Sequence, residues 1–270
     1  MSLSITPYEL IYWPGIPGRG EHVRLALEAT GTLYTDVAKS DPGVAVSTIQ
    51  SLVADDAGDN TSSSPAGVPG NPPGLAPPFL RHGDRVLISQ TPNILLYLAQ
   101  RLGLAGAGSA PGDGDLGMYH VNQLVLTALD GLSDEAHDAH HPIASGLYYE
   151  DQRAEAKRRA ENYRGERLPK FLGYFERVIK GNEERGGKGG WLYGGGLTAA
   201  DLVVFQGVDG IKYAFPKAMG KLEASGNYDR VFALHKAVAG LPKVKAYLES
   251  ERRAPYGMGI YRKYPELDDE

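Results

Sequence analysis

The segment DEAHDAHHP, residues 134–142, holds the densest group of side chains that could bind a metal ion. Asp134, His137, Asp138 and His141 recur at the spacing of one helical face. Imidazole and carboxylate groups on such a face can bind a divalent cation. The same spacing is also typical of a solvated helix face or of the rim of a cleft. We favour this second interpretation and predict no metal site.

The chain of 270 residues contains no cysteine. This excludes disulfides, thiolate metal sites and any mechanism with a protein thiol as nucleophile. It also suits a reducing compartment. Thiol chemistry, if the protein performs any, must therefore use a thiol that a ligand supplies.

Composition places the chain among ordinary soluble proteins. It is 42% hydrophobic and 23% charged, with a net charge of −5. No basic face indicates nucleic acid as a partner, and no run of eighteen apolar residues indicates a membrane span. The first residues do not read as a secretory signal. We expect a cytoplasmic protein that binds neither nucleic acid nor membrane.

The first hundred residues alternate between strand and helix signals. Short β-type runs are expected at 9–13 and 34–38, with a hairpin over 79–88. Helices are expected at 19–30 and 91–102, the second with Thr91 as N-cap and Pro92 at the first helical position. The order is β-α-β, a gap, then β-β-α. Residues 39–76 are predicted to be a long loop.

The remainder of the chain has helix signals alone. Helices are predicted at 116–140, 150–179, 198–213, 229–239 and 244–252. The Gly-rich stretch 105–114 separates the two parts, so we predict domains of residues 1–104 and 105–270. Thr198 and Asp201 have the spacing of a capping box and are interpreted as structural.

Three ordered segments, spread over most of the chain, share their motifs with one known family. They are YELIYWPGIPGRGEHVRLAL at 8–27, PPFLRHGDRVLISQTPNILLYLA at 77–99 and LTAADLVVF at 197–205. Together they resemble the cytosolic glutathione transferases of the tyrosine type, especially the pi and sigma classes. The resemblance implies an α/β thioredoxin-like N-terminal domain, an all-α helical-bundle C-terminal domain, glutathione as co-substrate and a homodimer.

Tyr12 matches the tyrosine that activates the glutathione sulfur in that family. A free thiol has a pKa near ~8.5, so little of it is thiolate at pH 7. A hydroxyl donor that stabilises the anion by ~1.4 kcal/mol lowers this pKa by about one unit. Tyr8 is the competing tyrosine on the same run, and we interpret it as a packing residue.

The resemblance also implies a set of glutathione contacts. Pro78 matches the cis-proline, and the residue before it, Pro77, can offer only its carbonyl because it has no N–H. Gln90 and Thr91 match the pair at a helix N-terminus that receives the γ-glutamyl carboxylate. An ordinary Pro-Pro loop and an ordinary N-cap are the alternative interpretations.

Three further residues are assigned to the glutathione site by the same resemblance. Trp13 follows the active tyrosine, and Arg19 matches the Arg of the family's Gly-Arg pair, although it could be a solvated surface residue. Asp134 matches the Asp that reaches across the dimer to the ligand's γ-glutamyl amine, although it could be a solvated helical acid.

Some features depart from the family pattern. The spacing from Tyr12 to Arg19 is one residue longer than in the pi class, and Ala76 stands where a Gln is common.

The function that the resemblance favours is conjugation of the glutathione thiolate to an apolar electrophile. A non-catalytic ligand-binding protein on the same scaffold, and a glutathione-dependent isomerase or reductase, remain alternatives.

Overall fold

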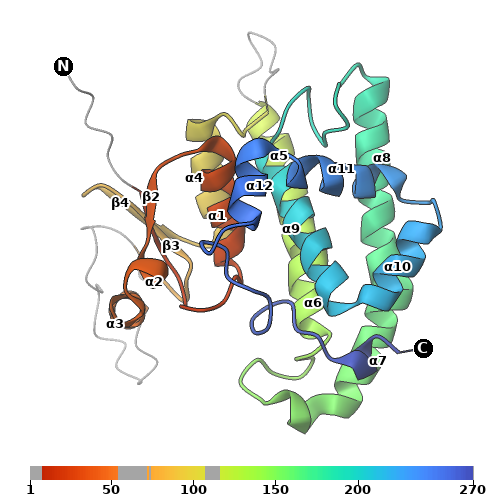
Figure 1. The fold of residues 1–270 in the computed structure, drawn as a ribbon, viewed down its shortest axis with the longest axis horizontal. Coiled ribbons are helices and arrows are strands. Elements are labelled where there is room, and N and C mark those ends of the chain that lie inside the picture. Colours follow the sequence, from red (N-terminus) through yellow and green to blue (C-terminus); the bar gives the residue numbers. More distant parts are fainter. Residues whose placement is uncertain (1–7, 54–71, 73, 107–115, 270) are drawn as a thin grey trace.

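The N-terminal part of the protein is built on a four-stranded mixed sheet (Figure 1). The computed structural model describes residues 8–53, 72, 74–106 and 116–269. Strand β1 (Tyr8–Ile11) pairs in parallel with β2 (Tyr34–Asp36) and antiparallel with β3 (Phe79–His82). Strand β4 (Val86–Ser89) closes the hairpin with β3. The sheet order is β2-β1-β3-β4, which confirms the expected thioredoxin-like arrangement.

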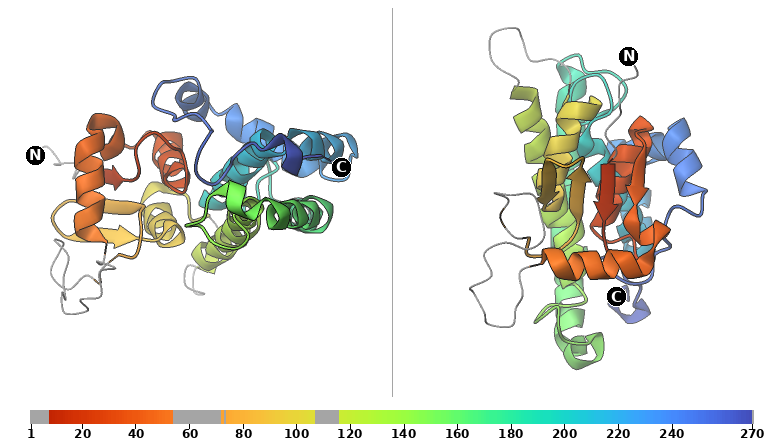
Figure 2. Two further views of the ribbon diagram at one scale, coloured as in Figure 1. Left: turned by 90° about the horizontal axis from the view of Figure 1, so that it is seen from below. Right: turned by 90° about the vertical axis from the view of Figure 1, so that its left-hand side faces the viewer.

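Helices cover both faces of this sheet (Figure 2). Helices α1 (Gly20–Thr30) and α4 (Thr91–Leu102) pack against each other on the face towards the helical part. On the other face lie α2 (Val37–Ser40) and α3 (Pro42–Leu52). Side chains of α3 join Ile11 and Phe79 of the sheet in a separate small hydrophobic cluster.

Helix α3 corrects the prediction of a loop over 39–76. Asp41 caps the helix by accepting hydrogen bonds from the backbone N–H groups of Gly43 and Val44. Ile49 and Leu52 are buried against the sheet. The β-branched residues of this segment obscured a helix that depends on packing rather than on intrinsic propensity. The other part of the expected loop, 54–71 and 73, lies outside the described residues.

All elements described in the second half of the chain are helical, as predicted. The regular helices are α5 (Leu116–Ala128), α6 (Glu135–Asp138), α7 (Arg153–Asn162), α8 (Leu168–Glu184), α9 (Ala199–Ala214), α10 (Pro216–Ala224), α11 (Asp229–Ala239) and α12 (Pro242–Leu248). Single π turns, Leu129–Asp134 and Tyr163–Arg167, continue α5 and α7, and 3₁₀ turns form Tyr149–Gln152 and Pro265–Leu267. Helix α10 was not predicted.

The domain boundary proposed at 104/105 stays a prediction, because residues 107–115 lie outside the described part. No described helix is long and apolar enough to cross a bilayer.

The buried helix α9 forms the centre of the helical part, and its start is fixed by the expected capping box. The Asp201 carboxylate accepts hydrogen bonds from the backbone N–H of Thr198 and from its hydroxyl, at 2.7 and 2.6 Å. The same carboxylate accepts the backbone N–H of Leu192 at 2.8 Å. Asp201 therefore holds the preceding loop against the helix and is structural, as predicted.

A buried charged network fixes α1 between the two parts of the chain. The Arg24 guanidinium donates to Asp36 of β2 at 2.6 Å, and the Tyr247 hydroxyl of α12 donates to Glu21 at 3.0 Å. Arg253 pairs with the same Glu21 carboxylate at 3.4 Å. Burial of these groups without partners would be costly, so the network fixes where α1 begins.

The segment after α12, which we call the C-terminal tail (residues 249–269), runs across the molecule between the two parts (Figure 1). The Tyr256 hydroxyl donates to Asp209 at 2.8 Å, and the Tyr261 hydroxyl donates to the Leu132 carbonyl at 3.0 Å. Near the chain end, the Asp268 carboxylate accepts the backbone N–H groups of Lys217 and Ala218, at 2.7 and 3.1 Å. The tail thus caps α10 and fixes its start.

Candidate functional site

The register of the sheet brings the predicted glutathione residues to one end of the sheet, where three neighbouring strands begin or finish. Ile11 of β1 pairs with Phe79 of β3, and Phe79 pairs with Ser89 of β4. The residues next to this row along their strands are Tyr12, Pro78 and Gln90, so all three lie at the same end of the sheet. The sheet therefore brings together three segments that are far apart in the sequence.

Tyr12 follows β1 and lies beneath the loop that leads into α1. The residue is 6% exposed, and its ring packs against Gly18 and Gly20. A Cβ atom added to Gly18 would lie 2.2 Å from the Tyr12 hydroxyl oxygen, and Gly18 has a φ of +47°. Only glycine suits this position, because a side chain would displace the phenol and would also strain the backbone.

The Tyr12 hydroxyl accepts the backbone N–H of Arg19 at 2.9 Å. Burial raises the pKa of Tyr12, while that hydrogen bond and the charges of Arg19 and Arg24 act in the opposite direction. The phenol is therefore neutral at pH 7. With its oxygen already accepting a backbone hydrogen bond, the phenol has its own proton to donate. Such a group can stabilise an adjacent anion but cannot act as a base.

The peptide bond between Pro77 and Pro78 is cis, as predicted. Both residues are buried, and β3 begins immediately after them. Pro77 has no N–H, so its carbonyl is the one backbone group it can offer to an extended ligand.

Gln90 and Thr91 form the start of α4, with one difference from the prediction. Gln90, not Thr91, is the N-cap, and its φ of +71° is unusual for a residue with a side chain. Thr91 is therefore the first helical residue and is 1% exposed. Its hydroxyl has no hydrogen-bond partner among the residues that the structure describes. A buried hydroxyl without a partner is costly, and a bound ligand could satisfy it.

Arg19 and Asp134 form an ion pair with each other, across 115 positions of sequence. Burial raises the pKa of Asp134, and the Arg19 charge counteracts this rise. The pair joins the start of α1 to the π turn after α5. The predicted contact of Asp134 with a ligand in a second subunit stays a prediction. Trp13 is 38% exposed beside Tyr12.

A buried polar chain beside this ion pair was not found from the sequence. His22 of α1 contacts the Ser133 hydroxyl through Nε2 at 3.2 Å, and Ser133 contacts the Tyr261 hydroxyl of the tail at 3.1 Å. His22 and Ser133 are fully buried. Burial, and secondarily the Arg19 charge, lowers the pKa of His22 to about 3.

Because the pKa of His22 is lowered in the folded protein, we predict that the free energy of unfolding depends on pH. An unfolded His22 takes up a proton near pH ~6.5, whereas the native imidazole excludes it down to about pH 3, so stability falls as pH decreases below ~6.5. In His22→Gln this contribution disappears. Between pH 7 and 5 we expect the wild type to lose about 2 kcal/mol more than the variant, measured by urea unfolding. The exposed His120 provides the control, as His120→Gln, and parallel profiles for wild type and His22→Gln would contradict the prediction.

Comparisons with known proteins agree with this architecture. Residues 137–251 match the family model for the glutathione S-transferase C-terminal domain. The chain is 23% identical over 180 residues to a glutathione S-transferase of Plasmodium falciparum, and the match covers 66% of this chain and 72% of the relative. It is 22% identical over 179 residues to one of Plasmodium yoelii yoelii, covering 66% and 70%.

Solved structures support the same fold. A pi-class glutathione S-transferase of Onchocerca volvulus superposes with a TM-score of 0.59 and 20% identity, covering 90% of this chain and 92% of the other. A prostaglandin synthase D of Nilaparvata lugens superposes with a TM-score of 0.58 and 20% identity, and the match covers 93% of this chain and 100% of the other. The chain thus resembles glutathione S-transferases in sequence, and it shares the fold of the solved structures.

Proposed function

We propose that this chain, which shares its fold and its C-terminal domain with the glutathione transferases, conjugates the glutathione thiolate to an apolar electrophile. The observation that carries the proposal is the Tyr12 hydroxyl, which accepts the Arg19 N–H and keeps its own proton for the sulfur. The thiol proton leaves to solvent. The thiolate then attacks the electrophilic carbon and forms the S–C bond. In a substitution the leaving group departs with the electron pair of its bond to that carbon; in an addition across a double bond the other carbon takes a proton from solvent.

Glutathione binding is proposed at the end of the sheet where Pro77, Gln90 and Thr91 lie. The γ-glutamyl carboxylate would lie at the start of α4, where free backbone N–H groups and the helix dipole favour an anion. The Thr91 hydroxyl, which has no hydrogen-bond partner among the described residues, supports this position. The cysteinyl backbone would pair with the Pro77 carbonyl, and Trp13 and Arg19 would line the sulfur end.

The Thr91 hydroxyl allows a sharp test of binding. In Thr91→Val the side-chain volume is nearly kept and no hydrogen bond within the described part of the chain is lost, so the fold should be as stable as the wild type. A lost hydrogen bond to the carboxylate should weaken glutathione binding about tenfold, measured by calorimetry.

Thr127→Val provides the matched control for this test. Thr127 is on α5, and its hydroxyl donates to the Gln123 carbonyl, away from the proposed ligand. Unchanged affinity in Thr91→Val would show that the Thr91 hydroxyl does not bind the carboxylate.

The electrophile is proposed to enter beside the loop of residues 14–18, on which the tail packs. A Cβ atom on Gly259 of the tail would lie within 3.9 Å of Gly18 and of the Ile16 side chain. We also propose a cytoplasmic homodimer, with Asp134 contributed to the ligand of the partner subunit.

Pro77 favours a second candidate, a ligand-binding protein without catalysis. The missing N–H removes one hydrogen bond of about 0.5–1.5 kcal/mol to the peptide backbone of glutathione. Calorimetry separates the two candidates, because an absence of glutathione binding at millimolar concentration would favour the non-catalytic protein.

A further inference from the structure

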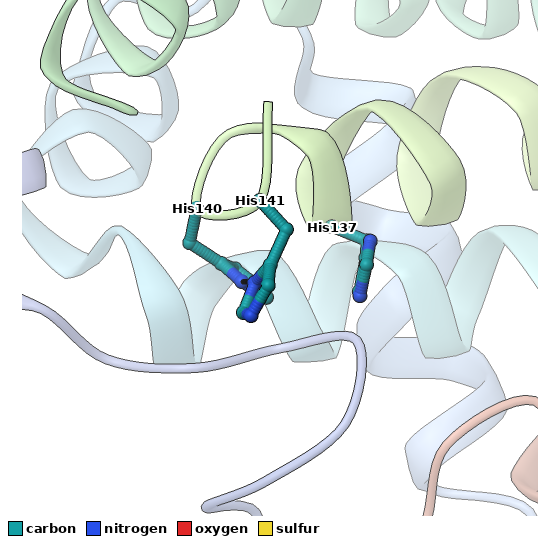
Figure 3. A group of neighbouring side chains, drawn as sticks. All are labelled: His137, His140 and His141. Atoms are coloured by element: carbon teal, nitrogen blue, oxygen red, sulfur yellow. Dashed lines mark hydrogen bonds between the residues drawn. The ribbon is translucent and has the colours of Figure 1, made fainter. Parts of the chain in front are cut away.

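Three histidine side chains converge where α6 ends (Figure 3). His137 is in α6, and His140 and His141 follow it in the next turn. Their ring centroids are 4.6–5.1 Å apart, and one nitrogen of each ring lies within 4.8 Å of the others. The sequence favoured a solvated or cleft-rim face here. His140 and His141 are instead buried, at 1% and 6% exposure, and His137 is half-buried.

The orientation of His140 is fixed by a backbone carbonyl. Its Nε2 lies 2.8 Å from the Ile260 oxygen of the tail. A carbonyl can only accept, so Nε2 carries the proton and Nδ1 carries the lone pair. This Nδ1 faces Nδ1 of His141 at a very short contact. Metal-binding histidines are typically oriented in this way, with the second ring nitrogen donating to a carbonyl.

Charged side chains of both signs lie near the three rings. The nearby charges of Arg262 and Arg19 oppose a cation. Two carboxylates attract a cation and so counteract this repulsion. That of Asp138 is 3.9 Å from His137 Nδ1, and that of Glu150 is near His141.

We propose that His137, His140 and His141 form a binding site for a divalent transition-metal ion, with Zn²⁺ as the probe. Three imidazoles are typical ligands for Zn²⁺, Cu²⁺ or Ni²⁺ and unsuitable for Mg²⁺ or Ca²⁺. A tetrahedral ion with Zn–N bonds of about 2.0–2.1 Å needs ligand nitrogens about 3.3 Å apart. His137 must therefore turn inwards, which its partial exposure permits, and the close Nδ1 pair must separate.

Such an ion would have a mechanical consequence. His140 already holds the Ile260 carbonyl of the tail, and Gly259, the residue before it, packs on the loop beside Tyr12. Fixing His140 through a metal would fix this part of the tail. None of the three histidines is among the proposed glutathione contacts, and metal binding is measured directly, so the test does not depend on transferase activity.

The experiment uses the full chain without a histidine tag, stripped of metal with a chelator. Zn²⁺ is titrated by calorimetry, and Co²⁺ is titrated while its visible d–d absorption is recorded. We expect one equivalent of metal and a Co²⁺ spectrum of tetrahedral intensity. His137→Ala, at the most exposed of the three positions, should weaken binding at least tenfold while circular dichroism stays unchanged.

His120→Ala is the matched control, because His120 is exposed on α5 and should not affect binding. The proposal is overturned if the wild type binds no stoichiometric metal. It is equally overturned if His137→Ala binds as tightly as the wild type, since the ion would then lie elsewhere.

Discussion

Replacing Tyr12 with phenylalanine is expected to lower kcat/KM for glutathione conjugation by about 100-fold. The substitution removes the one proton that the phenol can donate to the sulfur, and removal of such a preorganised donor typically costs this much. Glutathione should still bind, because its proposed carboxylate and backbone contacts are at Thr91 and Pro77. The pKa of the bound thiol should rise by at least about one unit, measured from thiolate absorbance in the ultraviolet.

Tyr8→Phe is the control for this prediction. Tyr8 is also buried, at the start of the strand that Tyr12 follows, and it stacks on His82 with a centroid distance of 4.0 Å. Loss of the Tyr8 hydroxyl should leave the pKa of the bound thiol unchanged. Tyr12→Phe also leaves the Arg19 N–H without its acceptor, at a cost of about 1 kcal/mol, so both variants should be assayed well below their unfolding temperatures. An unchanged thiol pKa in Tyr12→Phe would exclude this residue from activation.

Replacing Asp201 with alanine is expected to destabilise the protein by about 3 kcal/mol or more. Its carboxylate accepts three hydrogen bonds in a fully buried position, and the loss leaves two backbone N–H groups without an acceptor. For a chain of this size, that corresponds to a decrease in Tm of about 6–12 °C, measured by circular dichroism.

Asp229→Ala serves as the comparison for Asp201. Asp229 is also an acid in the first turn of a helix, but it is exposed, so its removal should cost less than about 1 kcal/mol. Equal losses of stability in the two variants would show that the buried hydrogen bonds of Asp201 contribute little. The role assigned to the capping box would then be wrong.

The end of the sheet at which the predicted glutathione residues meet was predictable from local signals. Tyr12, Pro78 and Gln90 each flank a short strand, and the β-α-β, β-β-α order fixes which ends of the strands meet. The cis bond at Pro77–Pro78 followed from a motif. These features depend on residues close to each other in sequence.

Features that depend on distant partners were not predictable. The ion pair of Arg19 with Asp134 joins residues that no local pattern relates. His140 was outside the helical spacing of its neighbours, and only the turn after α6 brings it beside His141. Helix α10 was missed because its cap, Asp268, comes from the far end of the chain.

The late position of Asp268 has a consequence for synthesis on the ribosome. The backbone groups at the start of α10 are made 51 residues before the carboxylate that satisfies them. At about 5–20 residues per second, the nascent helical domain waits for about 3–10 s with that helix end open to water or to chaperones. The cap can close only when Lys217 and Asp268 have both left the exit tunnel, so the start of α10 is completed later than the rest of that helix.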